Sequence, residues 1–200
     1  MYLIKIEIDR RSARHLLADC QQMHRFVTGL FGTDRQASQI LYRTKHLRDR
    51  LCIYLYAQTP VEQAPEYCDV QQRDITSWLE GMEEGQLWSF DLIAAPTKKV
   101  SAEGRKNSQR RILRSPAERQ AWLERKAEQS GFALLHAQEL EQLHISGSHR
   151  QDSGGMMYHD AYHYQGTLQI TDAAAFRRAM QGGIGSGRAY GFGMLMVKRL

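Results

Sequence analysis

A glycine-rich segment near the C-terminus, followed at once by an apolar stretch, constrains the fold of this chain more than any other feature. Six glycines fall between Gly182 and Gly193, Arg188 is the one charged residue among them, and Met194 to Val197 is apolar. Glycine permits positive φ and a close approach of the backbone, and successive amides in such a loop form a concave site for phosphate. The segment predicts a loop that holds a phosphate against the edge of a sheet. Its candidate contacts are Gly183, Gly185, Gly187 and Arg188.

The order of elements excludes a nucleotide cofactor of the usual kinds. Dinucleotide-binding fingerprints and P-loops run from strand through loop to helix, whereas here the loop leads into a strand. No Gly-Lys-Ser/Thr follows the glycines. The alternative without a ligand is that the glycines form only a tight turn and a bulged strand.

The balance of charge permits a polyanionic partner. Of 200 residues, 27 are Lys or Arg and 22 are Asp or Glu, so the net charge is +5. Residues 98–114 hold a basic cluster in which Glu103 is the only acid. A basic run is often a solvated loop, but this one also suits an arm that follows phosphates. The candidate phosphate contacts there are Lys98, Arg110, Arg111 and Arg114, with Arg150 at a predicted hairpin tip as a weaker candidate.

Cysteine usage and apolar content indicate a compartment. Cys20, Cys52 and Cys68 are isolated, without a Cys-x-x-Cys pair, which is typical of a reducing compartment. Residues 1–9 alternate apolar and polar side chains, so they do not resemble a signal peptide, and no apolar run reaches membrane-spanning length. We expect a soluble, cytoplasmic protein with no membrane partner.

The periodicity of apolar residues predicts an α+β fold. Residues 2–9 indicate a strand, 12–32 a helix capped by Ser12, and 40–44 and 51–57 strands. Residues 59–85 indicate a short helix near Pro60, an extended piece around Val70 and a helical turn near Trp78, and residues 87–94 indicate a strand. Residues 116–130 indicate a second long helix, 132–137 and 143–164 strands with a hairpin, 172–182 a helix, and 191–198 a final strand. This order predicts tandem ferredoxin-like (RRM-like) domains with antiparallel sheets. We expect an N-terminal domain at 1–95, carrying the helix with His24, and a C-terminal domain at 96–200, with the basic arm and the glycine loop.

His24 is the first candidate for proton transfer, although spacing alone does not separate it from seven other histidines. It lies at the edge of the apolar face formed by Cys20, Met23 and Val27, and Arg25 follows it directly. Histidine titrates near neutrality, so it can both give and take protons. An ordinary, partly buried side chain is the alternative, and packing explains Cys20 better than a nucleophilic role does.

His159 and His163 are a rival site. At positions i and i+4 of a strand they share a face and could bind a metal, but a catalytic zinc site normally needs three protein ligands. The alternative is aromatic sheet packing beside Tyr158, Tyr162 and Tyr164.

Four motifs together resemble a known family, the guide-RNA-processing endoribonucleases called CasE or Cse3 of type I-E CRISPR systems. The resemblance covers nearly the whole chain. The motifs are the strand at 1–5, QMHR at 22–25, AP at 95–96 with KK at 98–99 and SPAERQAWL at 115–123, and GIGSGRAYGFGML at 183–195. The last two are specific in combination, whereas the histidine motif is weak by itself.

The resemblance implies an activity. Members have tandem ferredoxin-like domains and cleave a CRISPR precursor transcript at the base of each repeat hairpin, without a metal or another cofactor. It implies that His24 is catalytic and that the enzyme keeps its mature guide RNA and joins the other subunits of the Cascade complex. Attack by the ribose 2′-OH would leave a 2′,3′-cyclic phosphate and a 5′-OH.

Two positions depart from the family pattern. Relatives often carry a tyrosine three residues before the histidine, where this chain has Gln21, and a lysine where it has Arg188. The role of that tyrosine is then missing or is supplied from elsewhere, for example by a tyrosine brought near in space. The alternative hypothesis is a non-cleaving subunit that binds an RNA stem within a ribonucleoprotein.

Overall fold

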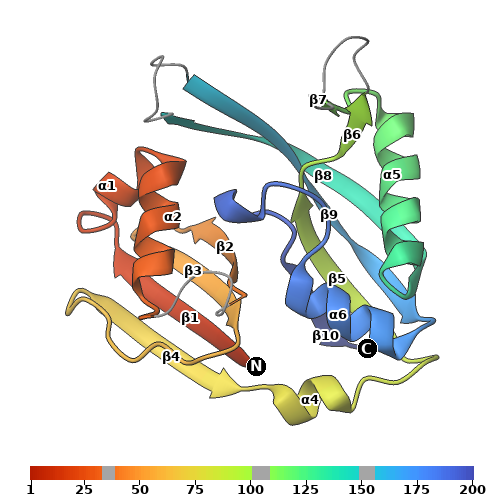
Figure 1. The fold of residues 1–200 in the computed structure, drawn as a ribbon, viewed down its shortest axis with the longest axis horizontal. Helices are drawn as coiled ribbons and strands as arrows, with labels where there is room; N and C mark the ends of the chain where they lie inside the picture. The colour runs from red at the N-terminus through yellow and green to blue at the C-terminus, as the bar shows by residue number, and fades with distance from the viewer. Residues whose placement is uncertain (33–38, 101–108, 149–155) are drawn as a thin grey trace.

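Two four-stranded antiparallel sheets form two lobes of the molecule (Figure 1). The computed structural model describes residues 1–32, 39–100, 109–148 and 156–200. The first lobe contains β1 to β4 with helices α1 and α2, and the second contains β5, β8, β9 and β10 with α5 and α6.

The first sheet has the order β2-β3-β1-β4. The strands span β1 Tyr2–Asp9, β2 Leu41–His46, β3 Arg50–Ala57 and β4 Cys68–Asp74. Alternation along β1 directs Ile4, Ile6 and Ile8 into a core with Met23 and Val27 of α2. The other face of the sheet packs against the core of the second lobe through Leu3, Tyr54 and Tyr56.

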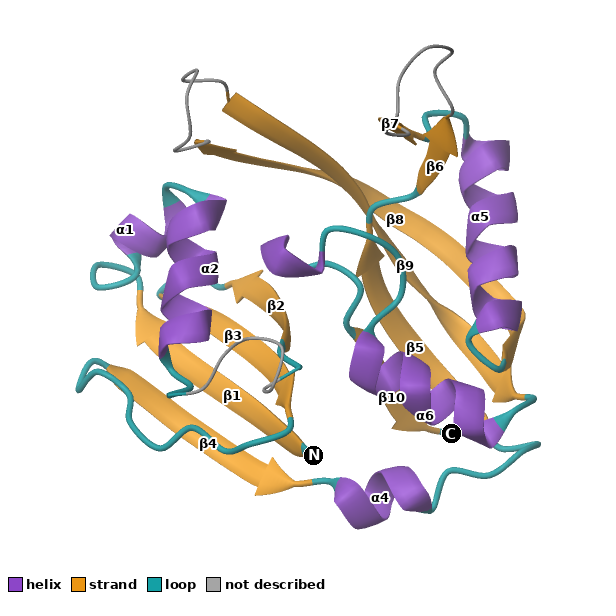
Figure 2. Ribbon diagram, viewed as in Figure 1, coloured by secondary structure: helices purple, strands orange, loops and turns teal. Residues whose placement is uncertain are grey.

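Two helices replace the single helix predicted for residues 12–32. They are α1 (Arg14–Leu17) and α2 (Cys20–Gly29), and Figure 2 shows α2 lying across one face of the first sheet. Ser12 is not the cap. Asp19 interrupts the helix with an extended backbone (φ −153°, ψ 125°), and its carboxylate accepts a hydrogen bond from the amide of Gln21.

The strand that closes the first sheet was predicted wrongly. Residues 87–94 form β5 (Leu87–Ala94), but β5 pairs with β9 and β10 of the second sheet. β4 closes the first sheet beside β1, and the predicted helical turn near Trp78 is α4 (Thr76–Glu80). No helix lies at residues 58–67. The division between the sheets therefore falls between β4 and β5, not at the expected boundary between residues 95 and 96.

The second sheet has the order β10-β5-β9-β8. Its further elements are α5 Pro116–Gln129, β8 Phe132–Ser148, β9 Met156–Ile170, α6 Ala173–Gly182 and β10 Leu195–Arg199. Both sheets thus have the strand order of a ferredoxin-like domain, which confirms the predicted fold class. Phe132 and Phe176 pack edge to face at 5.8 Å in the core beneath α6.

Two hairpins extend the second lobe. A short one, β6 (Thr97–Val100) with β7 (Gln109–Ile112), is inserted between β5 and α5. The long β8–β9 hairpin reaches from the second lobe across to the side of α1 and α2 (Figure 2). It begins earlier and runs further than the predicted hairpin, since β8 is continuous from 132 to 148. In the described parts of the chain, no helix is long and apolar enough to cross a membrane.

Candidate functional site

The glycine-rich loop lies between the two lobes and is held by its own backbone. The Ile184 amide donates to the Gly193 carbonyl at 2.8 Å, and the Gly193 amide donates to the Ile93 carbonyl at 2.7 Å. Gly187 has φ +77°, and a Cβ there would lie 2.7 Å from Cδ2 of Phe192. The loop therefore needs glycine for its packing as well as for any phosphate that it holds.

The same loop carries Tyr190 to the helix that bears His24. Tyr190 lies in the short 3-10 helix η1 (Arg188–Tyr190), and its hydroxyl accepts a hydrogen bond from Nε2 of Gln21 at 3.4 Å. The ring of His159 stacks on the Tyr190 ring with centroids 4.2 Å apart. The hydroxyl of Tyr42 donates to the Ala189 carbonyl at 2.8 Å. Residues from α2, β2, β9 and the loop thus meet around one phenol.

His24 shares a face of α2 with Gln21, because residues three apart on a helix are neighbours. Its side chain is partly buried, and the hydroxyl of Thr28 donates to its carbonyl at 2.9 Å. Arg25 is exposed on the next position of the helix. The Gln21 contact therefore brings η1 to the same side of α2 as the imidazole.

The predicted basic residues fall into separate places. Lys98 and Arg111 pair across the β6–β7 hairpin, and both contact Glu118 at the start of α5, at 3.1 and 3.3 Å. The hydrogen bond from Lys98 keeps the pKa of Glu118 below its ordinary value. Arg110 and Arg114 are exposed. Arg150 lies outside the described residues.

Arg188 is exposed, and its guanidinium turns back to donate to the Gly182 carbonyl of its own loop. Gly183 and Gly185 also have positive φ, at +76° and +88°. A Cβ at Gly185 would lie 3.0 Å from the Trp122 ring, so this glycine lets the loop approach α5.

His159 and His163 have different partners. Burial keeps the pKa of His159 below its ordinary value, and its ring contacts Tyr190. Nε2 of His163 lies 2.9 Å from the Asp91 carboxylate, which also receives the Arg43 guanidinium. Over the ranges that the structure describes, no group of three or more His, Cys, Asp or Glu side chains could hold a metal ion.

Sequence reasoning missed several of these contacts. Gln21 and Tyr190 are 169 residues apart in the chain, and no local pattern predicts their contact. Arg119 was given no role of its own in the sequence analysis, yet it is buried, binds Glu139 at 2.6 and 2.7 Å and lies over the Tyr162 ring. Arg43 and Asp91 join β2 to β5 across the two lobes.

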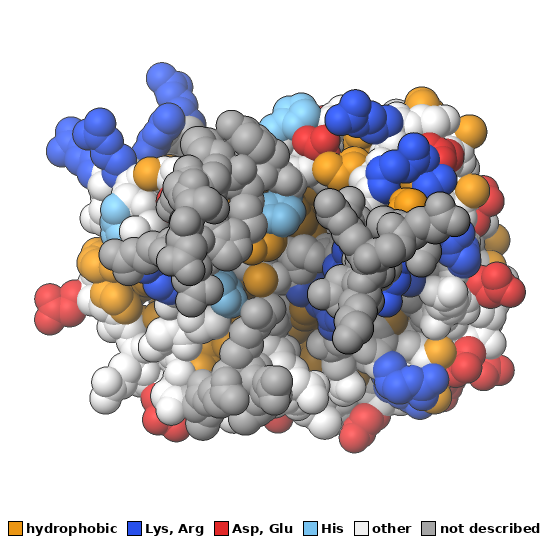
Figure 3. All heavy atoms as spheres, turned by 45° about the horizontal axis from the view of Figure 1, so that its top comes forward, with side chains coloured by type: hydrophobic (Ala, Val, Ile, Leu, Met, Phe, Trp, Pro, Cys, Tyr) orange, Lys and Arg blue, Asp and Glu red, His pale blue; other side chains and the backbone are white. Residues whose placement is uncertain are grey.

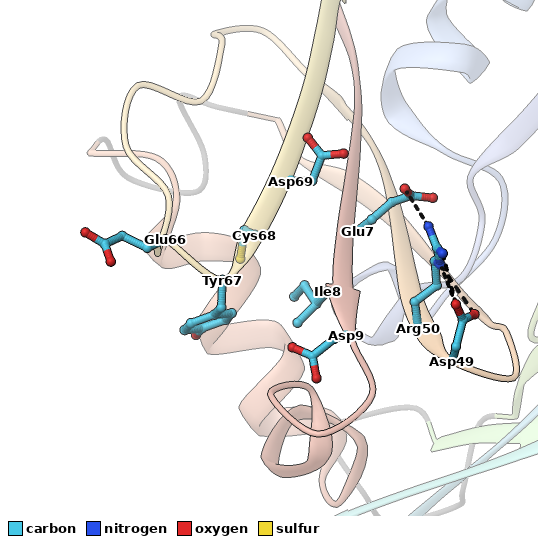
Figure 4. Close-up of a pocket in the computed structure, with 9 residues that line it drawn as sticks. All are labelled: Glu7, Ile8, Asp9, Asp49, Arg50, Glu66, Tyr67, Cys68 and Asp69. Atoms are coloured by element: carbon cyan, nitrogen blue, oxygen red, sulfur yellow. Dashed lines mark hydrogen bonds and ion pairs between the residues drawn. The ribbon is translucent and has the colours of Figure 1, made fainter.

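The surface differs in charge from place to place. In Figure 3, Lys and Arg side chains gather along the upper part of the view with histidines between them, while most acidic side chains lie along its lower and right-hand edges. A hollow of about 550 Å³ beside β1, β3 and β4 is lined by five acidic side chains and by Arg50 (Figure 4). Its acidic members are Glu7, Asp9, Asp49, Glu66 and Asp69. Its acidic side chains would repel a polyanion. A site for a polyanion is therefore expected around α2 and η1 instead.

Comparisons with known proteins agree with this architecture. The family model described as "CRISPR associated protein" matches residues 1–199. The CRISPR-associated endoribonuclease Cse3 of Thermus thermophilus is 27% identical, over 98% of this chain and 99% of that protein.

Solved structures match over the same extent. A CRISPR endoribonuclease Cse3 bound to a 19-nucleotide RNA superposes with a TM-score of 0.86 at 26% identity, covering 99% of this chain and all of that one. The CRISPR-associated protein Cas6e of Escherichia coli K-12 has the same fold, with a TM-score of 0.75 at 24% identity and full coverage of both chains. The chain is thus homologous to a CRISPR endoribonuclease throughout its length, and it belongs to the Cse3/Cas6e family of CRISPR-associated proteins.

Proposed function

We propose that this protein is a metal-independent endoribonuclease that cleaves a CRISPR precursor transcript at the base of its repeat hairpin. The observation that carries the proposal is the meeting of the glycine-rich loop with α2, where the Tyr190 hydroxyl contacts Gln21 one turn from His24. The homologous Cse3 of Thermus thermophilus has been solved with an RNA representing a pre-cleavage complex, at 26% identity and a TM-score of 0.83.

The substrate supplies the nucleophile. The ribose 2′-OH next to the scissile phosphate attacks the phosphorus, the bond to the 5′-oxygen breaks, and the products end in a 2′,3′-cyclic phosphate and a 5′-OH. Holding the 2′-OH in line with the leaving oxygen removes much of the entropic barrier. This transesterification conserves atoms and electrons without a redox step or a cofactor.

His24 transfers the proton. Its imidazole either takes the proton of the 2′-OH or gives one to the leaving 5′-oxygen, a contribution that is typically worth about 10²- to 10⁴-fold in rate. The guanidinium groups of Arg25 and Arg188 and the amides of the loop at Gly183, Gly185 and Gly187 stabilise the added charge on the phosphorane-like transition state. Arg188 would have to leave the Gly182 carbonyl to do so.

The basic hairpin binds the stem. Double-stranded RNA exposes its phosphates beside a wide, shallow minor groove, which suits long basic side chains on a projecting arm. Arg110 and Arg114 are exposed there, and Lys98 and Arg111 share a single carboxylate, which leaves a net positive charge for phosphates. Arg150, which follows β8 in the sequence, is assigned the same role.

The product complex has a further partner. Structures called CRISPR RNA-guided surveillance complexes contain a chain with this fold. We therefore assign the protein to such a complex, where it remains bound to the mature guide RNA beside the other Cascade subunits.

The test is cleavage of the repeat RNA from the protein's own genome in EDTA by the wild type, His24→Ala and His15→Ala. His15 is a matched control because it is an exposed histidine on α1. We expect one cut 3′ of the hairpin, a cyclic phosphate end, a rate loss of about 10²- to 10⁴-fold for His24→Ala, and no loss for His15→Ala. An RNA with a 2′-deoxyribose at the cut should not be cleaved by any of them.

Three outcomes would contradict the assignment. Equal cleavage by His24→Ala would remove His24 from the mechanism. Tight binding by the wild type without any cut would favour the non-cleaving RNA-stem-binding subunit, which the presence of Gln21 in place of the family tyrosine keeps open. Activity that returns only with added metal would favour His159 and His163.

A further inference from the structure

A small hollow of about 200 Å³ lies beside α2, on the side of Tyr190 toward the long hairpin. α1 and α2, β2, β8 and η1 all contribute to its walls. The lining side chains that bear on a ligand are Ala18, Thr44, His46, His144 and Tyr190. Neither the basic arm nor the glycines discussed above explain this hollow.

The chemistry of the walls suits a flat, uncharged, partly polar group. Among the residues that the structure describes, no Asp, Glu, Lys or Arg lines the hollow, whereas Tyr190 offers aromatic surface and Thr44 offers a hydroxyl. Burial, with a smaller effect of Arg10, keeps the pKa of His46 below its ordinary value, which favours a neutral imidazole with one donor and one acceptor.

Tyr190 is fixed where it borders the hollow. His159 stacks on its ring at 4.2 Å, and Gln21 contacts its hydroxyl at 3.4 Å. In the part of the wall formed by β8, Nδ1 of His144 lies 2.6 Å from the Asp160 carboxylate of β9, which holds the His144 ring on the β8–β9 hairpin. A preformed aromatic wall loses little freedom when a ligand stacks on it.

The hollow adjoins the proposed reaction site. On α2, Cys20 of the wall directly precedes Gln21, and Met23 of the wall directly precedes His24. Tyr190 borders the hollow and also contacts Gln21 beside the proposed reaction site. A nucleotide whose phosphate lies at His24 therefore has its base within reach of the hollow. The volume is below the about 300–1,000 Å³ of pockets that take drug-sized ligands, so it admits one ring system rather than a base pair.

We propose that this hollow, the base pocket, binds one unpaired nucleobase of the RNA, from a nucleotide that flanks the phosphate at His24. Unpaired bases in RNA are commonly splayed out, stacked on aromatic side chains and read along their edges. Here Tyr190 supplies the aromatic wall, and Thr44 and His46 face the edge of the base. The pocket would place the flanking nucleotide, and thereby the cut, relative to the stem. The proposal rests on the proposed function, because it names the part of the RNA that this site holds.

The test measures binding rather than cleavage. Repeat RNAs with a 2′-deoxyribose at the cut carry one abasic residue at each unpaired position in turn. Thr44→Phe fills the base pocket, and Ala18→Phe fills it from an exposed position, in case the first variant does not fold. Ala133→Phe is the control, since Ala133 lines a different hollow between α5 and β8.

At one flanking position, the abasic RNA should bind the wild type about five- to a hundredfold more weakly than the intact RNA. Filling the pocket should weaken binding of the intact RNA by a similar factor and leave binding of the abasic RNA unchanged. Ala133→Phe should keep the wild-type difference in affinity between intact and abasic RNA. A 2-aminopurine at that position should lose fluorescence on binding the wild type and keep it with the filled variants.

Two results would overturn the pocket alone. One is that the wild type binds every abasic RNA as tightly as the intact RNA. The other is that both filled variants lose the same factor of affinity for the intact RNA and for the abasic RNA. A wild-type protein that binds no repeat RNA at all would overturn the proposed function together with the pocket.

Discussion

At the residue scale, Gly187 is a position where the backbone of the loop requires glycine. Its φ of +77° is in the left-handed region, and a Cβ would press on the Phe192 ring at 2.7 Å. Gly187→Ala should lower the free energy of unfolding by about 2–5 kcal/mol, from backbone strain and overpacking together. It should also lower RNA cleavage more than the lost stability explains, because Gly187 begins the turn that presents Tyr190.

Gly182→Ala is the matched control for that measurement. Gly182 ends α6, has no positive φ, and has no atom within 4 Å of an added Cβ. Alanine should be neutral or slightly stabilising there, by at most about 1 kcal/mol, because alanine favours a helix over glycine. Equal effects of the two changes in thermal unfolding would contradict the account of the loop.

The residue scale is also where sequence reasoning reached its limit. The glycines and Arg188 could be singled out because composition and spacing are local, but these do not predict that their loop lies between the two lobes. Their role as phosphate contacts stays a prediction. The contact of Tyr190 with Gln21 could not be predicted, because it depends on how two lobes pack over 169 residues of chain. The idea of a tyrosine brought near in space does have a structural counterpart in Tyr190.

At the element scale, α2 depends on its cap. Asp19 accepts from the Gln21 amide at 2.8 Å, at the break that separates α1 from α2. Asp19→Ala should lower the free energy of unfolding by about 1 kcal/mol, since an unsatisfied amide is left at the helix start. Asp19→Asn retains an oxygen acceptor and should recover most of that loss in thermal unfolding. If Asp19→Asn lost as much free energy of unfolding as Asp19→Ala, the carboxylate charge rather than the capping hydrogen bond would stabilise the break between α1 and α2.

Elements with strong end signals were predicted well. α5 begins with Pro116 at its first turn and ends just before Gly131, which has φ +75°, and Asp172 caps α6 through the Ala175 amide. By contrast, Ser12 caps nothing, because the amide of Ser12 and that of Arg11 both bind Asp9 in a turn. A serine before an apolar run is a weaker signal than proline or aspartate, since several turns use it equally.

At the scale of the whole molecule, the tandem fold followed from the order of elements, but the division between its halves did not. β5 has the alternation of a half-buried strand, and that alternation predicts a sheet without saying which one. The structure resolves the ambiguity because β5 pairs with β9 over eight residue pairs, from Leu87 with Gln169 to Ala94 with Tyr162. β4 was predicted only as an extended piece around Val70, because most of its residues are polar, although it completes the first sheet.

The junction between the lobes has its own pH dependence. Burial tends to raise the pKa of Asp91, but hydrogen bonds from Arg43 and Gln165 outweigh it and keep the pKa below its ordinary value. Because that pKa is lower in the folded protein than in the unfolded chain, ionised Asp91 stabilises the fold above the unfolded pKa of about 3.9. This contribution is lost as the pH falls through the lower, folded pKa.

Asp91→Asn keeps the shape of the side chain and removes the charge that Arg43 and His163 share. We expect it to lower the free energy of unfolding by about 1.5–3 kcal/mol near pH 7, the range for hydrogen bonds to charged groups. The difference from the wild type should shrink steadily in denaturant titrations taken from about pH 5 to 2.5, as the wild-type carboxyl takes up its proton. Glu128→Gln, at an exposed carboxylate of α5, is the control and should change stability little at any of these pH values. A difference for Asp91→Asn that stays constant down to the lowest pH would mean that its carboxylate does not hold the lobes together through charge.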